Sequence, residues 1–227
     1  MFVQDLNKKG ITTGKIHGPW TIQKAPAKLG FTPLALGLDG SSTWINLGDF
    51  PDNCVSRLSK CLYGISVSFK ATVSGSGTGY LLSSAGVNVC YAEYTMHFIL
   101  QEKEKVWEVK HPYRKHTWQT FALSWSRANG LTTVIVGDTA SVLRDPNGRT
   151  VTPTAVSHTS VTIGKPNSEN AKYAEAVIRD VAVWDEEITE ERMTKLHVCD
   201  GEFKTFVGFR LEMTNSSLLI HWFCIVS

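Results

Sequence analysis

Carboxylates that alternate with lysines near residue 104 are the first candidates for chemistry in this sequence. Glu102, Glu104 and Glu108 are separated by even numbers of residues, and alternate residues of a strand point to the same face. Two such carboxylates about 5–5.5 Å apart form the catalytic pair of a retaining glycosidase. Lys103 and Lys105 interrupt the acidic residues, however. This mixture is typical of a solvated hairpin turn and argues against a catalytic cleft.

Other catalytic arrangements leave no pattern in the sequence. No G-x-S-x-G nucleophile elbow occurs, and the seven histidines lie on separate segments. No C-x-x-C pair or histidine pair has the spacing of zinc ligands. The stretch S-G-S-G-T-G lacks the Lys-Ser/Thr of a phosphate-binding loop, so we interpret it as a flexible turn. We therefore predict a protein that is not an enzyme.

An aromatic and basic segment, W-E-V-K-H-P-Y-R-K-H-T-W, is the strongest candidate for a contact surface. Rigid aromatic faces with polar edges stack on sugars, and the basic side chains would suit an acidic glycan. The candidate ligand-binding residues are Trp107, Tyr113, Arg114, Lys115 and His116. The alternative is structural: Trp118 and Trp125 alternate into the core or cap the sheet.

The cysteines set an expectation about the compartment. Cys54 and Cys61 flank the polar stretch V-S-R-L-S-K, and we predict a disulfide that closes this loop. Disulfides persist in oxidising compartments, so we expect a secreted protein or the extracellular part of a larger one. The alternative is a cytosolic protein with two free thiols. Cys90 can pair with Cys199, which would leave Cys224 unpaired.

The ends of the chain bear on the same question. The first ten residues lack the apolar core of a signal peptide, so either the chain begins inside a longer secreted precursor, which we favour, or the disulfide prediction is wrong. Asn215 begins an N-glycosylation sequon. The apolar stretch 218–227 is shorter than the roughly 20 residues that span a bilayer. This stretch has three alternative interpretations: a buried terminal strand, a truncated membrane segment, or sequence from an imperfect gene model.

Charge excludes one class of partner. Lys and Arg total 23 and Asp and Glu total 21, which gives a formal charge of +2. No long basic run is present, so we predict no nucleic-acid partner.

Alternation of apolar and polar residues predicts the elements that must position these side chains. R-A-N-G is a hairpin signal, because Asn-Gly tolerates positive φ. The expected strands lie at 34–48 (two short strands), 63–73, 79–83, 87–101, 104–110, 118–126, 131–138, 160–164 and 176–184. Their regular spacing favours an all-β fold of two antiparallel sheets packed as a sandwich.

One short C-terminal helix is expected after these strands. Thr189 is a suitable N-cap, Glu190 and Glu191 favour the first turn, and Met193 and Leu196 supply a buried side. We divide the chain into an N-terminal arm (1–17), the sandwich (18–200) and a C-terminal tail (201–227).

The order of three motifs resembles a known family. The motifs are L-D-G-S-S at 38–42, W-x-x-x-A-x-S-W at 118–125, and I-R-D-V with a following W and I-T-E-E at 178–191. In this order they resemble a laminin-G-like domain of the concanavalin A-like lectin/glucanase superfamily, over roughly residues 18–198. The chain departs from the family pattern at 135–138, where I-V-G-D replaces Y-V-N-G, and at Arg179, which replaces an acidic residue.

The resemblance implies a pentraxin-like jelly roll and a non-catalytic extracellular recognition or adhesion module that binds a glycan or a protein. A glycoside hydrolase of the glucanase type and a structural matrix component are the alternatives. The resemblance also implies a structural calcium ion at Asp39, Gly40 and Asp180, since calcium prefers oxygen ligands. A second set, Asp138, Asp145 and Asn147, resembles the rim where such modules place calcium. The alternative in both cases is ordinary turn and strand residues.

Overall fold

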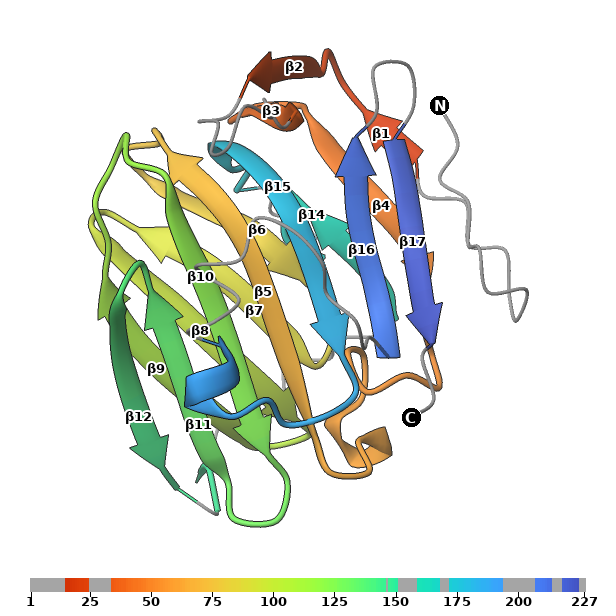
Figure 1. The fold of residues 1–227 in the computed structure, drawn as a ribbon, viewed down its shortest axis with the longest axis vertical. Helices are drawn as coiled ribbons and strands as arrows, with labels where there is room; N and C mark the ends of the chain where they lie inside the picture. Colours follow the sequence, from red (N-terminus) through yellow and green to blue (C-terminus); the bar gives the residue numbers. More distant parts are fainter. Residues whose placement is uncertain are drawn as a thin grey trace.

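Two antiparallel sheets pack face to face in the computed structural model, which describes residues 15–24, 34–145, 147–150, 159–167, 172–193, 207–213 and 218–224 (Figure 1). The two-sheet sandwich predicted from the alternating pattern is confirmed. No helix in the described part of the chain has the length and apolar character needed to cross a bilayer.

The first sheet has eight strands. Their order is β1 (Lys15–His17), β4 (Trp44–Asp49), β14 (Ser160–Ile163), β6 (Thr78–Ser83), β7 (Val87–Ala92), β8 (Thr95–Glu102), β9 (Lys105–Pro112) and β13 (Arg149–Thr150). The single strand expected at 87–101 is wrong, because a turn at residues 93–94 divides it into β7 and β8. Glu93 takes a φ of 55° there. Glycine usually occupies a turn position with positive φ, so the sequence gives no sign of this turn.

The second sheet has nine strands. Seven of them follow one another in the order β12 (Thr139–Arg144), β11 (Leu131–Val136), β10 (Gln119–Ser126), β5 (Gly64–Val73), β15 (Glu175–Trp184), β16 (Val207–Met213) and β17 (Leu218–Cys224). The other two form a branch, in which β3 (Leu34–Asp39) pairs with the first half of β15 and β2 (Thr21–Lys24) pairs with β3. Strands β16 and β17 place most of the C-terminal tail in this sheet, whereas Asn215 lies outside the described residues.

The core lies between the sheets and follows the alternation of the strands. Phe69 of β5 faces Phe121 of β10 with ring centroids 5.4 Å apart, and Val67 lies opposite Leu123 on the same inner face. Each fully buried side chain of this size contributes about 1.5–3 kcal/mol to folding. The core therefore fixes the register of β5 and β10, and β10 begins at Gln119, a residue that lines the candidate site.

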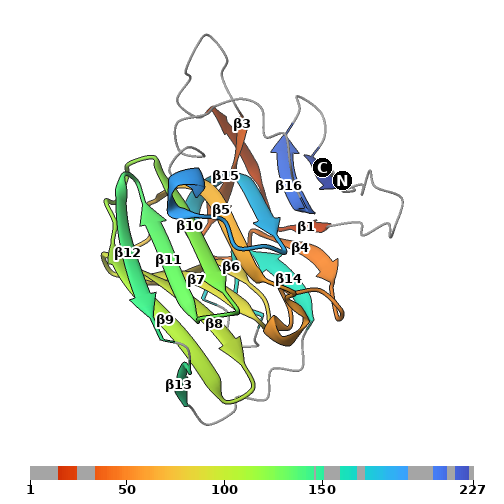
Figure 2. The same cartoon turned by 60° about the horizontal axis from the view of Figure 1, so that its bottom comes forward.

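The outer face of the second sheet carries the predicted helix, which begins at Glu190 (Figures 1 and 2). The backbone N–H of Arg192 donates to Oγ1 of Thr189 over 3.4 Å, which confirms Thr189 as the N-cap. Met193 packs with Ile188, Trp184 and Ala122 in a second apolar cluster. Leu196, the other residue expected on the buried side, lies outside the described residues.

Candidate functional site

An open cavity of about 420 Å³ lies at one end of the sandwich, between the β9–β10 loop and the turn that joins β11 to β12. Its volume falls within the range of about 300–1,000 Å³ that is typical of small-ligand pockets. The side chains that give it chemical character are His111, Arg114, Trp118, Gln119, Asp138 and Thr139. The aromatic and basic segment identified from the sequence therefore does border a cavity, but the set of residues that line the cavity differs from the five predicted ligand-binding residues.

Hydrogen bonds hold the two rims of this cavity in place. On the β9–β10 loop, Oε1 of Gln119 accepts from the backbone N–H of Arg114 over 2.7 Å. The backbone N–H of His116, a residue with φ of 56°, donates to the Val73 carbonyl over 3.0 Å. On the opposite rim, Gly137 takes a φ of 64° that suits a tight hairpin turn. Both rims are thus fixed before a ligand binds.

Two of the expected stacking residues, Trp107 and Tyr113, lie in the core and offer no open ring face. Their exposed fractions are 4% and 6%. Nε1 of Trp107 donates to the Asp145 carbonyl over 2.7 Å, and the Tyr113 hydroxyl donates to the Glu93 carbonyl over 2.8 Å. Burial, followed by the neighbouring tyrosines, raises the pKa of Tyr113 to about 12. Tyr113 borders the cavity but contributes only a satisfied, buried ring.

The three basic candidates separate along the loop. Arg114 is exposed and lines the cavity. Lys115 places its ammonium 5.0 Å from the ring centroid of Tyr94, a residue outside the cavity lining. His116 is exposed but also lies outside the lining. Only Arg114 of the three is positioned to meet a ligand in the cavity.

Of the lining residues, Gln119 is not singled out by the sequence pattern, whereas Trp118 ends the aromatic segment and Asp138 belongs to the second candidate calcium set. Trp118 is half-buried and lines the cavity, with the Arg179 guanidinium 5.9 Å from its ring centroid. Asp138 is exposed at the β11–β12 turn. The sequence feature that indicates this site is the Gly-Asp turn, because a hairpin turn beside an aromatic loop places polar groups at one end of a sandwich.

His111 belongs to the cavity wall. Its Nδ1 lies 2.7 Å from the Pro112 carbonyl oxygen, and its Nε2 lies 3.3 Å from Oγ1 of Thr139. Both ring nitrogens therefore have protein partners, and the imidazole links the two rims.

The proposed calcium ligands do not converge in the structure. Asp39 lies opposite Glu175 in the β3–β15 register, and Asp180 follows five residues later along β15. At about 3.3 Å per residue this separates the two by roughly 16 Å. Asp180 lies at an irregularity of β15 with φ of 52°, and its carboxylate is 3.5 Å from Nη1 of Arg179.

The carboxylate of Asp39 is already saturated by its own turn. It accepts from the backbone N–H groups of Ser41, Ser42 and Thr43 at 3.0, 2.8 and 2.7 Å. The hydroxyls of Ser41 and Ser42 donate to its second oxygen. Burial alone would raise the pKa of Asp39, but these hydrogen bonds outweigh it and hold the pKa well below its ordinary value. Gly40, with φ of 74°, completes the turn.

The second calcium set is also divided. Asp138 and Asp145 flank opposite ends of β12. Oδ1 of Asp145 accepts from the backbone N–H groups of Asn147 and Gly148 at 3.1 and 3.0 Å, as in an Asx turn. Within the described ranges, no three His, Cys, Asp or Glu side chains form a group that could hold a metal ion.

The candidate catalytic carboxylates lie away from the cavity. Glu102 ends β8, and Glu104 lies in the exposed turn that follows. Glu108 has basic neighbours: its carboxylate lies 2.8 Å from Nδ1 of His97 and 3.7 Å from Nη2 of Arg149. Asp138 is the single acidic side chain among the residues described as lining the cavity, so the lining has no carboxylate pair.

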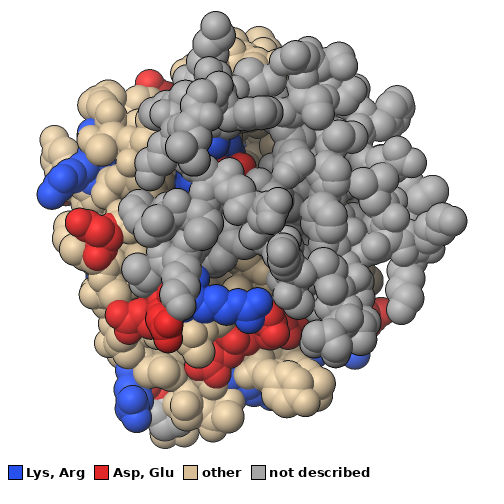
Figure 3. Space-filling model, viewed as in Figure 1, with Lys and Arg blue, Asp and Glu red and all other residues tan. Residues whose placement is uncertain are grey.

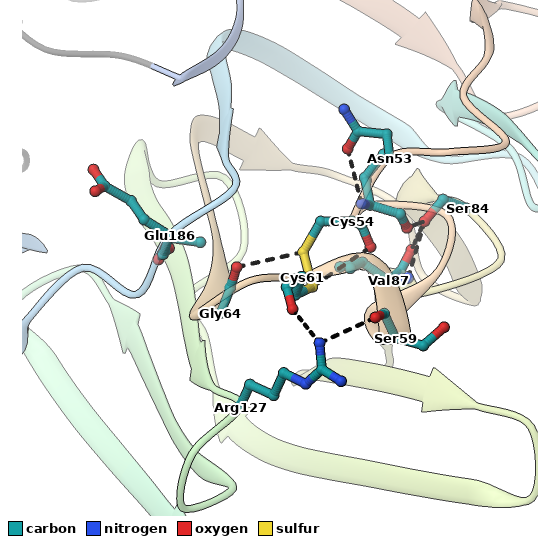
Figure 4. Close-up of a disulfide and its surroundings, with 11 residues drawn as sticks. Asn53, Cys54, Ser59, Cys61, Gly64, Ser84, Val87, Arg127 and Glu186 are labelled. Carbon is teal, nitrogen blue, oxygen red and sulfur yellow. Dashed lines mark hydrogen bonds between the residues drawn. A yellow bond between two sulfur atoms is a disulfide. The ribbon is translucent and has the colours of Figure 1, made fainter. Parts of the chain in front are cut away.

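The predicted Cys54–Cys61 disulfide is confirmed (Figure 4). The bond closes a short loop, and Sγ of Cys54 lies 3.3 Å from the Gly64 carbonyl oxygen. The Ser84 hydroxyl donates to the Val55 carbonyl over 2.6 Å, which ties the loop to β6 and β7. Cys90 is a free, buried thiol, and burial raises its pKa to about 11. Cys199, its expected partner, lies outside the described residues.

Comparison with known proteins identifies the fold. No family model and no curated protein matches the sequence. The botulinum neurotoxin serotype D/C binding domain superimposes with a TM-score of 0.59 at 10% identity over 87% of this chain and 51% of that chain. The serotype C1 binding domain gives a TM-score of 0.53 at 10% identity, covering 86% and 51%. A structure described as a receptor binding domain gives 0.57 at 12% identity, covering 87% and 50%.

The chain thus spans about half the length of these solved structures. At such low identity the likeness concerns the fold alone, and it confirms the predicted jelly-roll sandwich.

Proposed function

We propose that this chain is a non-catalytic extracellular recognition domain that binds a glycan in the cavity between the β9–β10 loop and the β11–β12 turn. The observation that carries the proposal is the composition of the lining: an indole, a guanidinium, an amide and one carboxylate around about 420 Å³, without a second acidic side chain. A hydrolytic site of the glucanase type would need a carboxylate pair.

The lining groups match the needs of a sugar ring. Trp118 provides a half-buried apolar surface, and aromatic side chains of this kind contribute large contact areas at low entropic cost. Sugar hydroxyls both donate and accept hydrogen bonds. Arg114 can donate and Asp138 can accept, whereas Gln119 has used its oxygen on the backbone N–H of Arg114 and retains its amide NH₂ as a donor.

Two further observations support this proposal. The Cys54–Cys61 disulfide fits an oxidising compartment. The botulinum neurotoxin structures with this fold are themselves described as binding domains. A protein ligand at the same surface is the second candidate, because the cavity is open and its polar rim would also suit a side chain of a partner.

A glycan array followed by calorimetry with the best ligand tests the proposal. We expect Trp118→Ala and Arg114→Gln each to weaken binding by about tenfold, the loss typical of a good contact. The matched controls are Tyr63→Ala and Arg144→Gln, which remove an exposed aromatic and an exposed arginine outside the cavity. Glycan binding that survives both cavity variants, or glycan hydrolysis that Glu104→Gln abolishes, would contradict the proposal.

A further inference from the structure

A second cluster of basic and aromatic groups lies on the eight-stranded sheet, where the chain enters the fold. His17 of β1 is the register partner of Trp44 on β4, and their rings stack in parallel with centroids 4.0 Å apart and an interplanar angle of 5°. The ammonium of Lys165, in the segment after β14, lies 4.3 Å from the centroid of the same indole. Because the imidazole fills one indole face, the ammonium occupies the other.

Lys15 adds another cation to this group. It lies two residues before His17 on β1, so both side chains point to the same face of the strand. Burial first, and then the charges of Lys15 and Lys165, lower the pKa of His17. Both ammonium groups are thus near enough to the imidazole to disfavour its protonation.

Among the described residues, no carboxylate forms an ion pair with Lys15 or Lys165. The ion pairs of the described residues involve other lysines and arginines, at Lys60, Lys110, Arg149, Arg179 and Arg192. Neither Lys15 nor Lys165 has a further electrostatic partner in the part of the chain that the structure describes. The two like charges near His17 repel each other, and the positive field that they produce attracts anions from solution.

We propose that the surface formed by Lys15, His17, Trp44 and Lys165 binds an acidic polysaccharide, with the two ammonium groups contacting sulfate or carboxylate groups on its sugars. Trp44 is a positioning residue: both of its faces are covered, so it holds Lys165 and His17 in place and leaves no face for a sugar. An extended polyanion fits better than a single small ion, because the two cations come from separate segments of the chain, Lys15 from β1 and Lys165 from the segment after β14.

This surface is independent of the cavity in the proposed function. It uses β1 and β4 at one end of the eight-stranded sheet, whereas the cavity lies beyond β9 near the other end of the same sheet. A chain with both surfaces would contact one glycan feature in the cavity and a polyanion elsewhere.

Binding of dextran sulfate, polygalacturonate and uncharged dextran to the full chain tests the inference, with duplex DNA as a second polyanion. We expect dextran sulfate or polygalacturonate to bind with an affinity that falls as salt rises, and the tighter of the two identifies sulfate or carboxylate as the preferred group. Lys15→Gln and Lys165→Gln should each weaken binding by about tenfold, and Lys165→Arg should restore most of it. Lys103→Gln, at an exposed hairpin turn, is the matched control.

Equal losses in the Lys165 and Lys103 variants would show a general effect of net charge and would overturn the inference. Full binding by the Lys15→Gln/Lys165→Gln double variant, equal binding of uncharged dextran, or tighter binding of DNA would also overturn it. Trp118→Ala should leave dextran sulfate binding unchanged. The failure of this surface and the failure of the cavity are therefore distinguishable.

Discussion

The guanidinium of Arg127 donates a hydrogen bond to the carbonyl oxygen of Cys61, so a side chain from the end of β10 holds the disulfide loop from outside (Figure 4). The same nitrogen donates to the Ser59 carbonyl over 3.0 Å, and the Arg127 backbone N–H donates to the Tyr63 carbonyl over 2.8 Å. The loop is thus fixed by a covalent bond within it and by hydrogen bonds from a distant residue.

We expect loss of the disulfide to cost more stability than loss of Arg127. The cysteines are seven residues apart, and closing so short a loop stabilises a fold by about 2 kcal/mol. Arg127→Ala should cost about 1 kcal/mol, because the freed carbonyls regain water. Chemical denaturation of Cys54→Ala/Cys61→Ala and Arg127→Ala measures both, with Arg144→Ala as control. A larger loss from Arg127→Ala than from the disulfide variant would contradict this ranking.

The Asp39 turn should become weaker in acid. Its hydrogen bonds hold the folded-state pKa of Asp39 below the unfolded value of about 4. Its contribution is therefore complete above about pH 4 and falls as the pH drops through the folded pKa. Asp39→Ala should cost roughly 0.5–2 kcal/mol at pH 7, the loss typical when a side-chain oxygen that accepts from backbone N–H groups is removed. Melts of both proteins from pH 7 to pH 2 test this; a difference that stays constant would contradict it.

The strand pattern was predictable because burial imposes a period of two on each strand. In β5, Ile65, Val67 and Phe69 all point into the core, as the alternation indicated. The division of 87–101 was not predictable, since Glu93 adopts a left-handed conformation without the glycine that usually marks it.

The candidate site was only partly predictable because its members meet through long-range contacts. Trp107 has the composition of a sugar platform, but its indole N–H is satisfied by the carbonyl of Asp145, 38 residues away. Trp118, for which the sequence also allows a core position, lines the cavity. Which tryptophan is buried depends on the path of the β9–β10 loop from one sheet to the other, and this path cannot be predicted from the neighbouring residues alone.

Asp185 should destabilise the protein above neutral pH. Acidic side chains gather on the outer face around the helix (Figure 3), and burial raises the pKa of Asp185 to about 6. Between about pH 4 and pH 6 the unfolded chain ionises before the folded one, so stability falls as the pH rises and stays lower above pH 6. Asp185→Asn should raise stability by roughly 2 kcal/mol at pH 7.5 and by little at pH 4. Thermal melts at both values check this, and equal effects at both would contradict it.

Asp39 and Asp180 should act independently, although a calcium site would couple them. Asp39 on β3 and Asp180 on β15 are separated by roughly 16 Å in the direction of the strands, and changes at sites more than about 10 Å apart usually add within about 0.5 kcal/mol. We therefore expect the losses of stability in Asp39→Asn and Asp180→Asn to add in the double variant, in calcium and in EDTA alike. A shared ion would instead make the second substitution nearly silent in calcium and would make wild-type stability depend on EDTA. Denaturation of the four proteins under both conditions decides between independent turns and a shared calcium ion.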